Sequence, residues 1–169
     1  RNNVRLINRH FDKREVLRRD HDKWFCPEYG SKANLTRLMS FYGKFMTLRI
    51  PHNAQPYLKS TFKDVWKSCS AELEDASTHT FRSEEDLTPE LFRTWQICES
   101  KFEPYNTYKD TKMFPLMVKP KQAVKAIREQ KYKLVCINDS VHIRNYEEVM
   151  HSLDEAFRSI LPDKSSFEL

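Results

Sequence analysis

Glycine is nearly absent from this sequence, since only Gly30 and Gly43 occur among 169 residues. A P-loop or a dinucleotide-binding turn needs several glycines in one short loop, because the backbone must approach the phosphates closely. Both kinds of site are therefore excluded. A phosphate bound by this chain has to be held by side-chain cations or by helix N-termini.

Long apolar runs and closely paired cysteines are also missing. No run approaches the roughly 20 apolar residues that a membrane-spanning helix requires. The four cysteines lie far apart and form no CxxC pair, which argues against a zinc ribbon. Their apolar neighbours predict buried free thiols and a reducing compartment. Because the sequence begins at Arg1 within periodic sequence, we expect a piece of a longer protein.

Positive charge is concentrated at the front of the chain. The net charge is +5, and residues 1–50 alone hold 12 Lys and Arg against 5 Asp and Glu. Such a segment can meet nucleic acid, an anionic membrane face or a phosphorylated polymer. A solvated, positively charged helical face explains the same composition, so charge alone does not choose a function.

The hydrophobic pattern predicts helices interrupted by short strands, which is typical of a helix-rich α/β fold. One strand is predicted at 45–50, where Pro51 ends it, and another at 133–137, a short apolar run between two helices. In open α/β sheets, ligands collect at the carboxyl ends of strands. His52 and Asp139 each follow one of these strands, so both are candidates for catalytic groups.

Start and stop signals give the other elements. Residues 102–118 predict a loop and one strand. Short helices are predicted within 1–25, one helix is capped by Asn34 and runs to Phe41, and another has Pro56 in its first turn. The next helix starts either after Arg82, with Ser83 and Asp86 as a capping box, or at Thr88-Pro89. Two more helices are predicted, one from Pro120 to Gln130 and a long one carrying Tyr146 to Leu161.

His52 and Arg82 each allow a catalytic and a structural interpretation. An imidazole titrates near neutral pH and can deprotonate a hydroxyl, whereas a loop histidine can equally well bond only to backbone. Arg82 precedes a predicted helix start, where a guanidinium and helix N-terminal amides can bind phosphate without glycine. The alternative for Arg82 is an ion pair with Glu85 or Asp86.

Asp139 follows the second predicted strand. Its carboxylate can bind a metal, act as a base or orient one. Alternatively it caps the next helix, because Asn138-Asp139-Ser140 is ordinary capping sequence. Only local hydrogen bonding is expected of the other histidines that lack metal-ligand spacing, namely His79, His142 and His151.

Taken together, these strings resemble the conserved regions of the Stealth proteins. Pro51-His52 before a helix and the run TFRSEED at 80–86 resemble the third region, while CIND at 136–139 resembles the fourth. The run PDKSSFE at 162–168 is similar to the family's C-terminal end. The likeness implies that 48–169 is the C-terminal part of a glycosyltransferase-A-like Stealth catalytic domain. Residues 1–47 resemble, more loosely, the basic and mostly helical connecting segment of capsule-type members.

The Stealth resemblance implies a sugar-phosphate transferase. Stealth proteins transfer a sugar 1-phosphate, here a hexose 1-phosphate, from a nucleotide sugar to a hydroxyl, forming a phosphodiester and releasing a nucleoside monophosphate. By resemblance His52, Arg82 and Asp139 are catalytic, and Arg82, Ser83 and Asn138 contact substrate. Arg82 would neutralise diphosphate charge, while either His52 or Asp139 assists the attacking hydroxyl.

Cofactor, partners and compartment also come from the resemblance. Mg²⁺ or Mn²⁺ is expected, although no ligand set is identifiable. The implied partners are a nucleotide-sugar donor and a glycan acceptor of capsule or surface polysaccharide synthesis, in the bacterial cytoplasm or at the inner membrane face; nucleic acid is not expected. The family's first region, with its Thr-Trp-Val-Asp string, and its acidic second region are absent from these residues, so an N-terminal part of the same enzyme is a further expected partner.

Two other functions compete with catalysis. The chain could be a non-catalytic module that holds the acceptor polysaccharide through its basic front half. Charge and aromatic content alone would also suit a nucleic-acid-binding domain, whose binding would be strongly salt-sensitive.

Overall fold

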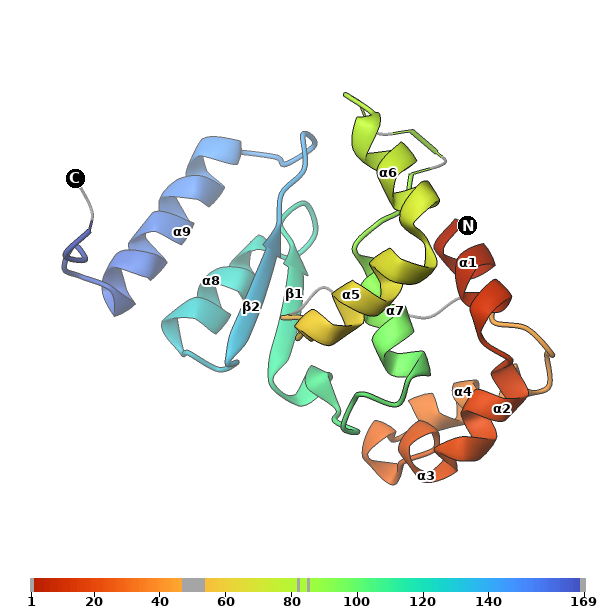
Figure 1. Ribbon diagram of the computed structural model, residues 1–169. Coiled ribbons are helices and arrows are strands. Elements are labelled where there is room, and N and C mark those ends of the chain that lie inside the picture. The colour runs from red at the N-terminus through yellow and green to blue at the C-terminus, as the bar shows by residue number, and fades with distance from the viewer. Residues whose placement is uncertain (1, 47–53, 82, 85, 168–169) are drawn as a thin grey trace. The chain divides into compact units, whose positions relative to one another are not determined.

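The computed structural model describes residues 2–46, 54–81, 83–84 and 86–167. Within these ranges the chain is helix-rich and carries one small parallel sheet, which confirms the predicted α/β class at this level. The elements are α1 (Asn2–His10), α2 (Lys13–Arg19), α3 (His21–Trp24), η1 (Pro27–Tyr29), α4 (Lys32–Ser40), α5 (Lys59–Ser68), α6 (Ser70–Thr78), α7 (Glu90–Cys98), η2 (Thr107–Lys109), β1 (Thr111–Pro115), α8 (Pro120–Arg128), β2 (Leu134–Asn138) and α9 (Tyr146–Ile160) (Figure 1).

The first of two compact units contains α1 to α7. Its core is built from apolar side chains at helical spacing, and Leu6, Ile7 and Leu91 are completely buried. α1 therefore packs against α7, although the end of α1 at His10 and the start of α7 at Glu90 are 80 positions apart in the chain. Helices on both sides of the predicted boundary between 47 and 48 share this core. That boundary rests on family resemblance and stays a prediction.

The chain that follows α4 is anchored by a buried lysine. The side chain of Asn8 donates to the carbonyl of Phe45 at 2.8 Å and accepts from its N–H at 2.8 Å. Lys13 is 6% exposed, and burial lowers the pKa of its ammonium group. The ammonium donates to three backbone carbonyls, those of Met39 at 2.5 Å, Tyr42 at 2.9 Å and Lys44 at 3.2 Å.

The scarcity of glycine shapes the end of α7. Ser100 has a φ of 65°, a left-handed conformation that glycine usually occupies. The N–H of Ser100 donates to the carbonyl of Ile97 at 2.9 Å, and that of Lys101 to Gln96 at 3.0 Å. This is the Schellman arrangement with serine in the place of glycine.

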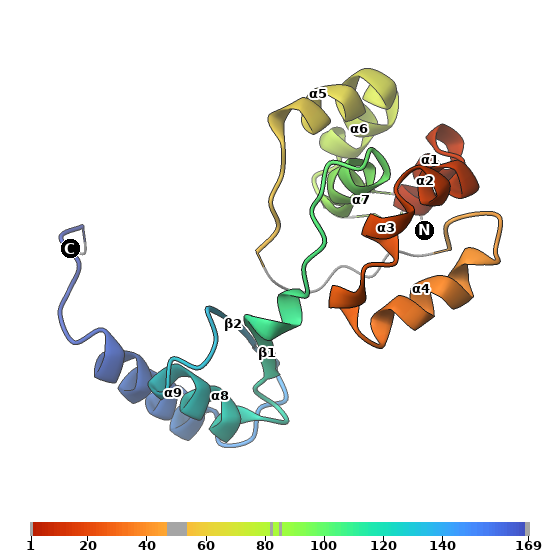
Figure 2. The same cartoon turned by 90° about the horizontal axis from the view of Figure 1, so that it is seen from below.

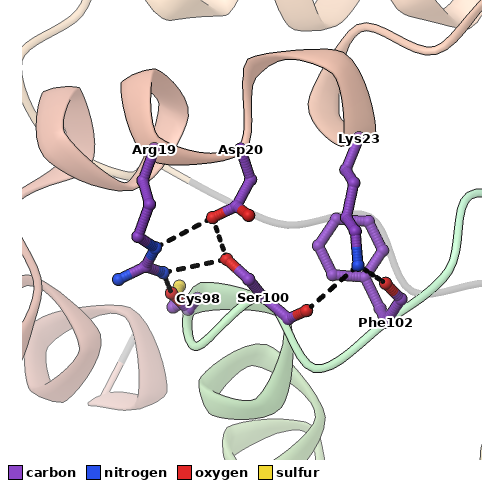
Figure 3. A network of polar contacts seen from close by, with 6 residues as sticks. All are labelled: Arg19, Asp20, Lys23, Cys98, Ser100 and Phe102. Atoms are coloured by element: carbon purple, nitrogen blue, oxygen red, sulfur yellow. Dashed lines mark hydrogen bonds and ion pairs between the residues drawn. The ribbon is translucent and has the colours of Figure 1, made fainter.

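The Ser100 side chain makes polar contacts with Arg19 of α2 and with Asp20, which offset the energetic cost of its left-handed backbone conformation (Figure 3). Arg19 donates to the Ser100 hydroxyl oxygen at 2.9 Å and to the Cys98 carbonyl at 2.6 Å, and the Ser100 hydroxyl donates to Asp20. The Ser100 hydrogen bond, followed by that of Arg19, lowers the pKa of Asp20. The Lys23 ammonium donates to the carbonyl of Phe102 at 2.9 Å. These bonds tie the α2–α3 junction to the segment after α7.

The second unit contains η2, β1, α8, β2 and α9. β1 and β2 pair in parallel, with Thr111 opposite Leu134 and Pro115 opposite Asn138. α8 forms the crossover between them, as a parallel pair requires. α8 and α9 lie side by side on one face of the sheet in both views (Figures 1 and 2). Their core members are Phe114, Leu116, Ala123, Ala126, Ile127, Leu153 and Ala156.

The predicted helices from Pro120 and over 146–161 and the strand at 133–137 are confirmed to within a few residues. Asn34 is not a cap: it lies inside α4, where its side chain accepts from Arg37 at 3.0 Å. Nor is Pro56 in a helical turn, because α5 begins at Lys59. The side chain of Gln96 in α7 bonds to the carbonyl of Pro56 at 3.4 Å and to the N–H of Leu58 at 2.9 Å. These tertiary bonds hold the proline segment outside α5. Most of the predicted strand at 45–50 lies outside the described residues.

Candidate functional site

Asp139 lies directly after the carboxyl end of β2, as the sequence predicts. Its side chain is exposed, and one carboxylate oxygen accepts from the N–H of Ser140 at 2.6 Å. Asn138 is the last residue of β2, and its carbonyl accepts from the N–H of Leu116 at 3.0 Å. The side chains of Asn138 and Asp139 are thus presented to solvent at a strand end, where α/β sheets hold ligands.

The alternative prediction, that Asp139 caps the next helix, is wrong. α9 begins at Tyr146, and its N-cap is Asn145 in a left-handed conformation. Asp139 bonds instead to the residue immediately after it, so its carboxylate shapes the loop and does not satisfy the helix terminus. Its second carboxylate oxygen has no hydrogen-bond partner among the described residues, and is therefore available to a ligand.

Ser83 belongs to a small polar cluster with His79 and Asp86 in the first unit. Asp86 accepts from the N–H of Ser83 at 2.7 Å and from the Ser83 hydroxyl at 3.1 Å. His79 Nδ1 lies 2.5 Å from Asp86 Oδ1, the oxygen that also accepts from the Ser83 hydroxyl, and an ionised carboxylate there requires the proton on Nδ1. The backbone bond from Ser83, then the bond from His79, lowers the pKa of Asp86. The local hydrogen bonding predicted for His79 is seen in this contact with Asp86.

The predicted helix start after Arg82 is wrong. The N–H of Ser83 donates to the Asp86 carboxylate, but neither residue lies in a helix. α7 begins at Glu90, in agreement with the second predicted start at Thr88-Pro89. A residue before proline is driven out of helical geometry, so Pro89 stops a helix from running through Thr88. The carbonyl of Thr88 instead accepts from the N–H of Leu91 at 2.9 Å, as the first bond of α7. Helix N-terminal amides therefore do not lie at Ser83, Glu84 or Asp86.

The Asp86 cluster predicts a local response to acid. A carboxylate whose pKa is lowered by folding stabilises the fold above its unfolded pKa of about 3.9, and this contribution is lost as the pH falls through the folded pKa. We expect the Ser83 amide to be protected from hydrogen exchange at pH 5 and to lose protection as the pH falls through the lowered pKa of Asp86. Asp86→Asn should abolish this pH dependence while leaving that of the Asp20 cluster unchanged, and an unchanged profile in Asp86→Asn would contradict the assignment.

The other two predicted catalytic residues, His52 and Arg82, lie outside the described residues. Their roles, and the substrate contacts predicted for Ser83 and Asn138, stay predictions. Sequence reasoning missed the pairing of Asp86 with His79. The sequence signal for this pair is a histidine at the end of a helix with an acid seven residues later. Many other acids lie at comparable distances from a histidine, so this signal does not single out Asp86.

The described residues contain no cluster of three or more His, Cys, Asp or Glu side chains that could hold a metal ion. Cys69 and Cys98 are buried free thiols, as predicted, while Cys26 and Cys136 are half-buried and free. Burial raises the pKa of Cys98 to about 12, which makes this thiol a packing residue and not a nucleophile. None of the helices in the described part of the chain is both long and apolar enough to cross a membrane.

Comparison with known proteins shows that the strand end carrying Asp139 lies within a conserved region of a protein family. Residues 125–169, which include β2 and Asp139, match the model described as Stealth protein CR4, conserved region 4. The chain is 34% identical to a receptor polysaccharide phosphotransferase WefC of Streptococcus gordonii and 33% identical to a capsular polysaccharide phosphotransferase WcwK of Streptococcus pneumoniae. It is 32% identical to an exopolysaccharide phosphotransferase cps2G of Lactiplantibacillus plantarum. No solved structure matches.

These matches confirm the resemblance seen in the sequence: the chain belongs to the Stealth family and carries its fourth conserved region. Each of the three similarities covers 99% of the chain. The chain nevertheless spans only about half the length of these relatives, 50% of the first two and 49% of the third. It therefore corresponds to one half of a protein of that kind.

Proposed function

We propose that this chain is the C-terminal part of a sugar-phosphate transferase with a glycosyltransferase-A-like catalytic domain. The observation that carries the proposal is the position of Asp139, at a strand end within the matched Stealth region. The phosphotransferase names of the relatives support the reaction class. The reaction would serve capsule or surface polysaccharide synthesis in the bacterial cytoplasm, at or near the inner membrane face.

The proposed step transfers a hexose 1-phosphate. A hydroxyl oxygen of the glycan acceptor attacks the phosphorus that bears the sugar, while its proton passes to a base. The bond from this phosphorus to the bridging oxygen breaks, and a nucleoside monophosphate leaves with that oxygen. The product is a phosphodiester. Positioning and charge neutralisation supply most of the catalysis in such a step.

The proposed roles follow from the chemistry of each side chain. Arg82 neutralises charge on the diphosphate, since a guanidinium can bind two phosphate oxygens at once. Either His52 or Asp139 takes the proton of the acceptor hydroxyl. Asn138 contacts the sugar or phosphate beside Asp139. Ser83 reaches substrate only if its hydroxyl leaves Asp86, because the described hydroxyl already bonds to that carboxylate.

We keep Mg²⁺ or Mn²⁺ as part of the proposal on the strength of the family relationship. When bound, such an ion neutralises phosphate charge. The described residues alone provide no ligand cluster, so ligands would have to include residues outside them.

Asp139 provides the test of this function. In the natural-length protein, we expect Asp139→Asn to lower the rate of nucleoside monophosphate release about 100-fold or more, because the amide cannot accept a proton. The matched control is Asp154→Asn on α9, where the carboxylate bonds only to Arg158 at 2.7 Å and is exposed. Activity should be measured across a panel of nucleotide sugars with single-turnover kinetics.

The same experiment separates catalysis from acceptor binding. A non-catalytic acceptor module predicts a raised KM for the glycan with an unchanged kcat. A kcat within twofold of the unsubstituted protein, with either outcome for KM, would overturn the catalytic role of Asp139.

A further inference from the structure

The sheet of the second unit is covered on one face only. Parallel sheets in proteins almost always have both faces covered, because the crossover helices and their neighbours bury the strands from two sides. Two strands alone are also marginal in water. In the described residues, α8 and α9 cover one face of β1 and β2 (Figures 1 and 2), and no third strand pairs with either edge.

Strand alternation identifies the side chains of the two faces. Residues paired across the strands point to the same side, and successive residues point to opposite sides. Phe114 and its partner Ile137 pack into the core beneath α8 and α9, so theirs is the covered face. Met113 and its partner Cys136 therefore lie on the opposite face, together with Leu134.

The opposite face is apolar and open in the second unit. Met113 is 40% exposed and Leu134 is 45% exposed, while Cys136 is half-buried. Thr111, paired with Leu134, adds no charge to this face. We call Met113, Leu134 and Cys136 the open sheet face. Its side chains carry no charge to bind a phosphate, and they suit an apolar layer of protein.

We propose that the open sheet face binds the part of the natural protein that corresponds to the unmatched half of its relatives. The relatives are about twice as long as the match, so a protein of their kind contains a second segment of similar size. A parallel sheet that the described residues of its own unit cover on one face alone lacks a second layer, which such a segment would supply. The occupant is therefore an intramolecular apolar layer.

This docking would also complete the candidate site. Asn138 is paired with Pro115, two residues beyond the pair of Met113 and Cys136, and so lies on the same side of the sheet. A layer seated on the open sheet face would reach the strand end that carries Asn138 and Asp139. The inference rests on the proposed function in one respect, namely that the whole protein has the size of its relatives.

Photo-crosslinking in the natural-length protein tests the proposal without any need for activity. p-Benzoylphenylalanine in place of Leu134 should form crosslinks to peptides from outside these 169 residues, and mass spectrometry identifies these peptides. The matched control carries the same group in place of Leu161, an exposed apolar residue beyond α9, and should give few such crosslinks. Crosslinks from position 134 to residues 1–50 or 55–106, which make up the first unit, or to a second isotope-labelled copy, would overturn the proposal.

Cys136 supplies a second readout from the protein's own chemistry. In the natural-length protein, Met113→Glu should raise the alkylation rate of Cys136 at least tenfold, because a carboxylate at the interface opposes docking. Lys112→Glu is the control, since its side chain points to the other side of the strand and is exposed. An unchanged Cys136 rate in Met113→Glu would contradict the docked arrangement. Since neither readout measures transfer, a docked face with no transferase activity would refute the proposed function alone.

Discussion

Replacing His52 with alanine in the natural-length protein should lower kcat for nucleoside monophosphate release by about 10²- to 10⁴-fold, the usual contribution of a general base. The proton of the acceptor hydroxyl would then have to pass to water. If His52 is the base, the pH–rate profile of the unsubstituted protein should also show an ionisation near neutral pH that His52→Ala removes. If Asp139 is the base, the ionisation of the base should instead survive in His52→Ala and be lost in Asp139→Asn.

A control histidine makes this result specific. His151 lies on α9, is exposed, and approaches Glu155 at 3.5 Å, so His151→Ala should leave kcat unchanged. Thermal unfolding of each variant shows whether a loss of rate comes from a loss of folded protein. A His52→Ala protein that folds normally and retains kcat within threefold would remove His52 from the mechanism.

Replacing Lys13 with methionine should lower the free energy of unfolding of the first unit by about 3 kcal/mol, one of the largest single effects expected here. Methionine fills a similar volume, so packing is retained. The carbonyls of Met39, Tyr42 and Lys44 lose a charged donor, and hydrogen bonds to charged groups contribute more than neutral ones. The change should appear in denaturant unfolding followed by tryptophan fluorescence, because Trp24 lies in the same core.

Lys67→Met is the matched control for this substitution. Lys67 is an exposed residue near the end of α5, and its removal should change stability by no more than about 0.5 kcal/mol. Equal effects of Lys13→Met and Lys67→Met would show that the three carbonyl bonds contribute nothing to stability.

The parts of the fold that sequence predicts well are those fixed by local pattern. Pro120 opens α8 as expected. The apolar run at 134–137 forms β2, as its position between two helices predicts. The position of Asp139 follows directly from that strand. This half of the candidate site was therefore readable from a few consecutive residues.

Other features depend on partners that lie far away in the chain. Lys13 sits among charged neighbours and gives no sign that it is buried, since its partners are carbonyls about 30 residues later. Pro56 has the local character of a helix start, yet Gln96 holds it outside α5. At residues 83–86 two local signals conflict, and the conformational constraint of Pro89 prevails over the capping pair of Ser83 and Asp86. Long-range hydrogen bonds are invisible to periodicity.

The packing of α1 against α7 has a consequence for synthesis on the ribosome. Leu6 and Ile7 leave the ribosome early, but Leu91 and Trp95, which cover them, are translated more than 80 residues later. At translation rates of roughly 5–20 residues per second, the apolar side of α1 is without its native cover for several seconds. We expect chaperones to bind the nascent chain during that interval, and the first unit to become stable only after α7 has emerged.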